Sequence, residues 1–287
     1  MYESHFGFTD RPFLAESCTN RYFPGESIEA ARQSLTRCIE RAEGCGLVIG
    51  QIGTGKTLLC EVLAEHFQNS LSVVILRGVP MATSKDLLQS ILYELGLPYR
   101  RLQEGELRLS LIDYLTPNED CPHGMLLLVD EAHHLSPRLF EELRTLTNLV
   151  RGGTSRVRLV LTGDPVIEER FAHPKLASFS QRLVARCYLE SLTASETIQY
   201  IRAQTATAGV DPDKLWTENA LRAIHRSSNG CPRLINQLCD HTLVLAVSNT
   251  STIINEAAVE AAWAALQQLP VTTNDILSTT ENFAGDD

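Results

Sequence analysis

The sequence lacks the features that mark a membrane or secreted protein. Its longest apolar runs, Met125–Val129 and Leu243–Val247, fall far short of the ~18 residues that a membrane-spanning helix needs. The first eleven residues contain acids and a histidine where a secretory signal would place a basic stretch followed by an apolar block. We therefore expect a cytoplasmic protein with no membrane span.

Paired cysteines and positive charge are also scarce. The eight cysteines are scattered, and no two have the C-x-x-C spacing of metal sites and redox dithiols, so we expect buried thiols. The formal net charge is -10, which argues against a protein that coats nucleic acid through its overall charge. DNA binding would have to rely on a local basic patch, and the acidic balance does not indicate it.

What is present is an alternation of strands and helices that stops near residue 190. Short apolar runs predict strands at 47–49, 73–76, 125–129, 157–161 and 186–189, with helical patterns between them. This order predicts a three-layer αβα domain with a parallel sheet. After Leu192 only helical patterns follow, and the first opens with a capping box of Thr193 and Glu196. We expect an αβα domain with its N-terminal segment over 1–190, a small helical lid over 191–270 and a disordered acidic tail over 271–287.

The segment Gly50–Thr57 matches the pattern G-x-x-x-x-G-K-[ST] between a predicted strand and a predicted helix. In this pattern the loop amides and the helix dipole bind phosphate oxygens, Lys56 neutralises the β and γ phosphates, and the Thr57 hydroxyl suits Mg²⁺. The chain is therefore predicted to bind ATP with Mg²⁺. The loop residues expected to hold the nucleotide are Gly50, Gln51, Ile52, Gly53, Thr54, Gly55, Lys56, Thr57 and Leu58.

Two acids, Asp130 and Glu131, directly follow the strand predicted at 125–129. Acids at the end of a buried strand are costly unless a cation or a water needs them. We expect Asp130 to hold the Mg²⁺ shell with Thr57, and Glu131 to polarise the attacking water with Lys56 nearby, which predicts an ATPase. His133 and His134 lack a third ligand at a telling spacing, so we interpret them as local hydrogen bonders.

The string Asp130–His133 also occurs in DEAH-type RNA helicases. Those enzymes resemble two tandem sheet domains, whereas only helices are predicted here after Leu192. A sheet domain with strand-end acids, followed by a helical lid that carries Gly230–Arg233, instead resembles the AAA+ ATPases. Within that class the chain is similar to the general secretion pathway protein A family over roughly residues 1 to 269. The matching segments are Tyr2–Phe13, Gln181–Arg182 and Pro232–Asn236.

The resemblance implies roles for two arginines. Arg233 corresponds to the second sensor, which reaches the γ-phosphate of its own subunit; the first turn of a helix is a poor place for a cation unless an anion is near. Arg182 corresponds to the arginine finger that enters a neighbour's site, with Arg186 as its rival. A finger acting on a neighbour implies a homo-oligomer, either a ring or a helix.

The resemblance places the first sensor within Thr162–Pro165. Relatives commonly carry glutamine where Asp164 stands, and a carboxylate there would repel phosphate, so Thr162 and Asp164 both stay open for this role. The aromatic residues Phe13, Tyr22 and Phe23 either line the adenine pocket or fill the edge of the core, which is the commoner use near a chain start.

Three functional hypotheses follow. The first is an ATPase that couples its nucleotide state to a partner protein of an envelope or secretion complex, although the membrane helix and wall-binding module of the family are expected to be missing. The second is a DNA-associated ATPase of the transposition-helper type, with salt-sensitive DNA binding. The third is an ATP-gated assembly switch with little hydrolysis, which Glu131 argues against.

Overall fold

The computed structural model describes residues 2–78, 81–119 and 121–267. The chain divides into two compact units, one formed by residues 16–191 and the other by the first fifteen residues together with residues from Leu192 onward. Within the described ranges, no helix has the length and apolar character that a membrane crossing requires. The tail predicted at 271–287 lies outside the described residues.

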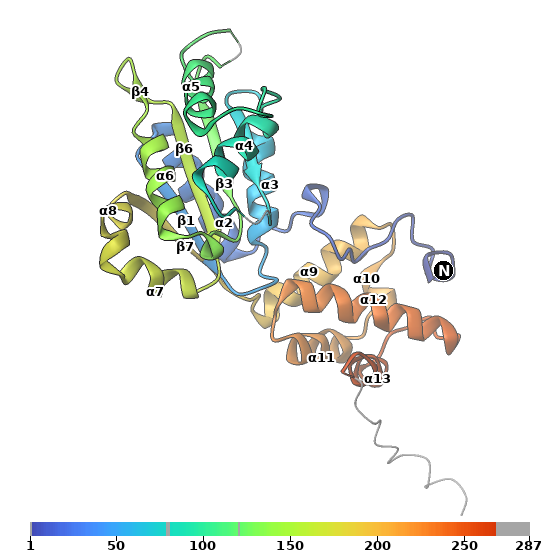
Figure 1. Ribbon diagram of the computed structural model, residues 1–287. Helices are drawn as coiled ribbons and strands as arrows, with labels where there is room; N and C mark the ends of the chain where they lie inside the picture. Colours follow the sequence, from blue (N-terminus) through green and yellow to red (C-terminus); the bar gives the residue numbers. More distant parts are fainter. Residues whose placement is uncertain (1, 79–80, 120, 268–287) are drawn as a thin grey trace, which may run out of the picture. The chain divides into compact units, whose positions relative to one another are not determined.

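The larger unit is built on a five-stranded sheet in which every neighbouring pair is parallel. Its strands are β1 (Cys45–Gly50), β2 (Ser72–Leu76), β3 (Met125–Val129), β6 (Val157–Gly163) and β7 (Leu183–Leu189), in the order β2-β3-β6-β1-β7 (Figure 1). All five predicted strands are present, and the fifth begins three residues earlier than expected. The predicted αβα class is confirmed.

Strand β3 shows how the sheet is covered on both faces. Leu126 and Leu128 belong to a buried cluster with helices α2 (Glu26–Arg41) and α3 (Lys56–Phe67). Leu127 and Val129 point to the other face and join a cluster with α4 (Ser84–Glu94), α5 (Glu104–Tyr114) and α6 (Pro137–Thr147). Successive side chains of a strand alternate between faces, so a wholly apolar strand needs a helical layer on each side.

The remaining elements of this unit are short. They are η1 (Thr19–Arg21), η2 (Ala132–His134), the hairpin of β4 (Val150–Arg151) and β5 (Thr154–Ser155), α7 (Val166–Ala172), η3 (Pro174–Leu176) and α8 (Ala177–Ser180). Helices α4 and α6 both carry the caps that the sequence predicts. The Thr83 side chain accepts from the Asp86 amide, and the Ser136 side chain accepts from the Leu139 amide with Pro137 at the first helical position.

The parallel order of the sheet brings three strand ends together. Strand β6 lies between β1 and β3, and the residues at the carboxyl ends of all three therefore meet at one edge of the sheet. These ends carry Gly50 from β1, Asp130 after β3 and Thr162 in β6. Ligand sites of open parallel sheets lie at this edge.

The smaller unit is helical. It contains α1 (Tyr2–Phe6), α9 (Ala194–Thr207), α10 (Pro212–Leu215), α11 (Glu218–Ser228), α12 (Pro232–Ser248) and α13 (Glu256–Leu266). The expected capping box is formed, since the Thr193 side chain accepts from the Glu196 amide and the Glu196 carboxylate accepts from the Thr193 amide. An isolated bridge between Trp216 and Ile254 is the one strand-like pairing described in this unit.

The N-terminal residues pack in the helical unit, whereas the sequence analysis assigned them to the αβα domain. Asp240 on α12 accepts a hydrogen bond from the Tyr2 hydroxyl at 2.6 Å and two from Arg11, at 2.9 and 2.6 Å. Phe13 is buried against Trp216, with ring centroids 6.0 Å apart. Residues more than 200 positions apart make these contacts, and no local pattern could reveal them.

Candidate functional site

The loop between β1 and α3 has the geometry of a phosphate-binding loop. Gly55 caps α3 with φ at 104°, a left-handed conformation that favours glycine, and it has no side chain to cap the first helical amides. Gly50 is equally constrained: a Cβ there would lie 2.6 Å from Thr54 Oγ1 and 3.0 Å from the Leu189 carbonyl oxygen. The Thr54 hydroxyl donates to the Gln51 carbonyl at 2.9 Å and so tightens the loop.

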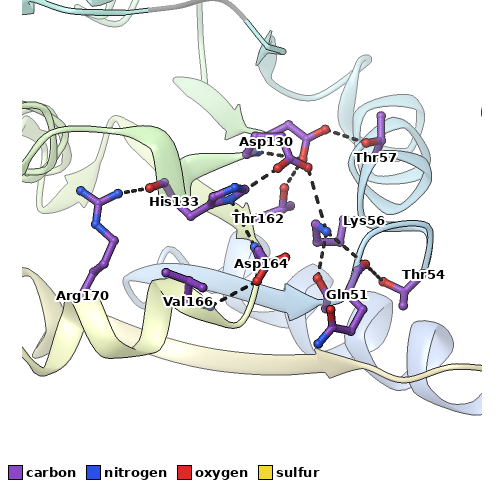
Figure 2. A network of polar contacts seen from close by, with 12 residues as sticks. Gln51, Thr54, Lys56, Thr57, Asp130, His133, Thr162, Asp164, Val166 and Arg170 are labelled. Carbon is purple, nitrogen blue, oxygen red and sulfur yellow. Dashed lines mark hydrogen bonds and ion pairs between the residues drawn. The ribbon is translucent and has the colours of Figure 1, made fainter.

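Lys56 lies beneath this loop with only 5% of its surface exposed. Its ammonium donates to the carbonyl oxygens of Gly50 at 2.9 Å and Gln51 at 3.2 Å (Figure 2). One carboxylate approaches it, that of Glu131, with Oε1 at 4.0 Å from Nζ. A buried ammonium held mainly by neutral carbonyls is well placed to attract an anion.

Asp130 receives hydrogen bonds from two hydroxyls on different elements. Thr57 on α3 donates to Oδ2 at 2.6 Å, and Thr162 on β6 donates to Oδ1. The carboxylate is nearly buried, and its Oδ1 atom also accepts from the Glu131 amide at 3.0 Å. Figure 2 shows the three side chains converging where the strands end. Asp130 and Thr57 thus present hard oxygen atoms side by side, which is the chemistry that Mg²⁺ prefers.

Glu131 stands in a strained backbone conformation with φ at 53°. Its two carboxylate oxygens have different neighbours: Oε1 lies 4.0 Å from Lys56 and Oε2 lies 3.4 Å from His133 Nδ1. Burial lowers the pKa of His133 below its ordinary value, and the adjacent His134 lowers it further, so the ring is neutral at pH 7.

Arg170 on α7 holds the segment that follows Glu131. Its guanidinium donates to the carbonyl oxygens of His133 and Leu135 and lies over the Phe140 ring, 5.6 Å from the centroid. Nothing in the sequence pattern indicated this role, because Arg170 is separated from these carbonyls by 35 to 37 positions.

The two candidates for the first sensor, Thr162 and Asp164, make different contacts in the structure. Thr162 is fully buried and touches Asp130, whereas the Asp164 carboxylate accepts at 3.3 Å from the Val166 amide two residues later. The Asp164 amide donates to His133 Nδ1 at 3.3 Å. Thr162 therefore contacts the acid group of the site, and the Asp164 side chain serves the local turn.

Arg182 directly precedes β7, and Arg186 lies in the middle of that strand. Strand β1 pairs with β7 so that Cys45 faces Leu183 and Gly50 faces Leu189, and the Cys45 amide bonds the Arg182 carbonyl at 2.9 Å. Leu183 lies five residue steps of strand from the level of the phosphate loop, which is roughly 16 Å, and Arg182 precedes it. Arg186 donates to Ser180 Oγ at 2.9 Å. Arg182 thus lies at the edge of the sheet opposite its own loop.

Arg233 lies in the smaller unit, at the second position of α12, and its side chain is exposed. Within residues 2–78, 81–119 and 121–267 it forms no ion pair. Its expected role as a second sensor stays a prediction.

The loop fits a bound Mg-nucleotide on two grounds. The first amides of α3 have no intrahelical acceptor and no capping side chain, so phosphate oxygens can satisfy them. The buried Lys56 ammonium and the paired oxygens of Thr57 and Asp130 supply the charge and the metal ligands that a triphosphate needs.

Comparisons with known proteins agree with this geometry. Residues 39–171 match a family described as AAA domain. Over 253 residues the chain is 33% identical to general secretion pathway protein A of Aeromonas hydrophila, a region that covers 88% of this chain and 46% of the relative. The chain therefore spans about half the length of that curated relative.

Solved structures share the fold at low identity. The ORC2 protein of Aeropyrum pernix, solved in ADPNP and ADP complexes, has a TM-score of 0.67 at 18% identity. The match covers 90% of this chain and 72% of the ORC2 chain. Cdc6p from Pyrobaculum aerophilum has a TM-score of 0.70 at 19% identity, and the match covers 93% of this chain and 71% of the Cdc6p chain. The Thermotoga maritima RuvB Holliday junction branch migration motor has a TM-score of 0.56 at 20% identity, and the match covers 83% of this chain and 69% of the RuvB chain.

The chain contains an AAA domain over residues 39–171, and 88% of its length is similar to general secretion pathway protein A.

Proposed function

We propose that this protein binds ATP at the Gly50–Thr57 loop and hydrolyses it with Glu131 as the group that polarises water. The observation that carries the proposal is the position of Glu131. Its carboxylate lies 4.0 Å from the Lys56 ammonium, and in the chain it directly follows Asp130, whose carboxylate is hydrogen-bonded to Thr57. A group that accepts a proton from the attacking water must lie within reach of the γ-phosphate.

Each residue has a separate task in this proposal. Lys56 binds phosphate oxygens, and those oxygens compete with Glu131 for its ammonium. Thr57 and Asp130 would hold Mg²⁺, which when bound neutralises charge on the β and γ phosphates. Thr162 keeps the Asp130 carboxylate in place. Glu131, once turned from Lys56, accepts a hydrogen bond from the water.

We also propose that hydrolysis depends on a second copy of the chain. Arg182 lies on the opposite sheet edge from its own loop, so it is available to a neighbour's phosphates rather than its own. A head-to-tail interface of this kind repeats into a ring or a helix. Arg233 would report the γ-phosphate to the helical unit, and the resulting change in that unit would act on a bound partner.

The similarity to general secretion pathway protein A favours a protein partner from an envelope or secretion complex. The net charge of -10 disfavours DNA as the main partner. Stimulation of turnover by DNA at low salt, and its loss at higher salt, would support the DNA-linked alternative instead.

The decisive experiment compares Glu131→Gln with the wild type in Mg²⁺-dependent ATPase and nucleotide-binding assays. Glutamine keeps the shape but cannot accept a proton, so turnover should fall by about 10²–10⁴-fold while ATP still binds. Lys56→Ala should weaken binding itself by about 10–100-fold, because a charge-assisted contact is lost. Unchanged turnover in the glutamine variant would exclude Glu131 as the catalytic base.

A further inference from the structure

Three side chains with metal-ligating atoms gather in the turn after β3. Glu131, His133 and His134 each offer one ligand atom, and all three atoms lie within 4.8 Å of one another. From the sequence alone the two histidines lacked a third ligand. The structure supplies it from Glu131, two positions before the first histidine.

The spacing within this cluster matches tetrahedral coordination. Glu131 Oε2 and His133 Nδ1 are 3.4 Å apart. Two ligands bound to one tetrahedral Zn²⁺ at about 2.0–2.1 Å are separated by roughly 3.4 Å. The rings of His133 and His134 lie with centroids 4.0 Å apart, and the ligand atom of the exposed His134 lies within 4.8 Å of the other two.

Hydrogen bonds from Arg170 hold the backbone that carries the cluster. His133 and His134 lie in the single turn η2, and Glu131 is its N-cap residue. Arg170 donates to the carbonyl oxygens of His133 and Leu135 on either side of His134. Ligands on such a supported turn lose little freedom when an ion binds, which favours affinity.

A cation can reach the cluster without displacing Lys56. A cavity of about 410 Å³ opens beside it and is lined by Asp130, Glu131, His134 and Leu135, among others. Lys56 approaches Glu131 through Oε1, whereas His133 faces Oε2, so the two neighbours use different oxygens. The cavity leaves room for water as a fourth ligand.

We propose that Glu131, His133 and His134 form a binding site for a transition-metal cation of the Zn²⁺ class, distinct from the Mg²⁺ ligands Thr57 and Asp130. Imidazole nitrogen favours Zn²⁺ and its neighbours in the first transition row, whereas Mg²⁺ prefers oxygen. Occupation of the site engages the Glu131 carboxylate and so stops hydrolysis; this consequence rests on the proposed function.

The test titrates the full chain, without nucleotide, with ZnCl₂ by calorimetry and with CoCl₂ by visible absorption. The wild type should bind one equivalent at this site, and Co²⁺ should show the strong bands of tetrahedral coordination. His134→Ala removes an exposed ligand and should weaken Zn²⁺ binding at least about tenfold. His66→Ala, which removes an exposed histidine from the last turn of α3, is the control and should bind as the wild type does.

Equal Zn²⁺ affinity in His134→Ala and the wild type would overturn the site, as would an equal loss in His66→Ala. In Mg²⁺-ATPase assays His134→Ala should keep wild-type turnover and need at least about ten times more ZnCl₂ for half inhibition. Metal binding that depends on His134 in a protein without ATPase activity would keep the site and reject the proposed hydrolysis. Normal turnover together with metal binding that does not depend on His134 would reject the metal site and keep the proposed hydrolysis.

Discussion

The Thr162 hydroxyl donates a hydrogen bond to the carboxylate of Asp130, and the two side chains are 0% and 8% exposed. The bond joins the central strand β6 to the acid that follows β3. A buried carboxylate is held in one orientation only if its oxygens are satisfied, so Thr162 fixes the orientation of Asp130, the proposed Mg²⁺ ligand.

Replacing this hydroxyl tests its role. Thr162→Val keeps a β-branched side chain in the strand and removes the donor, which should lower ATPase kcat about tenfold because a bond to a charged group contributes about 1.5–3 kcal/mol. ATP should still bind through the loop. Thr162→Ser keeps the hydroxyl and should restore most of the rate. Equal rates for the valine variant and the wild type would show that Asp130 needs no support from β6.

The arginine finger can be tested by mixing inactive subunits. Arg182→Ala retains its phosphate loop, and Lys56→Ala retains Arg182, so each alone should lose activity, the former by on the order of 10³-fold. A mixed assembly joins an intact loop to an intact finger across one interface and should recover part of the turnover. The measurement is the steady-state ATPase rate at several mixing ratios.

Arg186→Ala is the matched control for that experiment, because Arg186 bonds Ser180 and stands four positions farther along the chain. If Arg182 is the finger, Arg186→Ala keeps its activity. Recovery with Arg186→Ala in place of Arg182→Ala would assign the role to Arg186, and no recovery with either would reject action in trans.

Gly50 offers a test of the loop's close packing. Gly50→Ala would place a methyl group 2.6 Å from Thr54 Oγ1 and 3.0 Å from the Leu189 carbonyl oxygen, so the loop must shift. We expect a loss of stability of about 1–3 kcal/mol and much weaker ATP binding. Gly105→Ala, in helix α5 with nothing within 4 Å of the new methyl, should instead stabilise by about 0.5–1 kcal/mol. Denaturant unfolding of both variants measures the difference.

Glu29 on α2 makes the stability of the larger unit depend on pH. Its bond to Arg32, with further bonds from Gln33 and Tyr22, lowers the pKa of Glu29 from 4.5 to about 2. Because the folded pKa is the lower one, this stabilisation is fully present above pH 4.5 and is lost as the pH falls toward 2. Glu29→Gln should therefore cost roughly 1–3 kcal/mol at pH 7.

The cost of Glu29→Gln should shrink steadily in urea unfolding experiments between pH 4.5 and pH 3. Glu40→Gln, at an exposed position of the same helix, serves as control and should change stability little at either pH. A cost for Glu29→Gln that is constant over this pH range would show that the carboxylate charge is not its source.

The elements of the larger unit could be predicted where local chemistry is strong. The apolar run Met125–Val129, the cap at Ser136 and the loop Gly50–Thr57 each depend on residues close together in the chain. The helix α5 and the hairpin of β4 and β5 were not predicted. Their patterns are weak, and packing against α4 and the loop ends decides their structure.

The phosphate loop, the strand-end acids and the helical character of the second unit could be predicted from the order of residues, because each depends on short-range requirements: glycine geometry, apolar periodicity and helix capping. Long-range packing alone establishes that Thr162 rather than Asp164 touches Asp130, that Arg170 holds the turn after Glu131, and that residues 2–15 pack on α12. These are contacts between residues 32 to 238 positions apart. Their geometry arises when strands and helices pack, and no spacing in the chain encodes it.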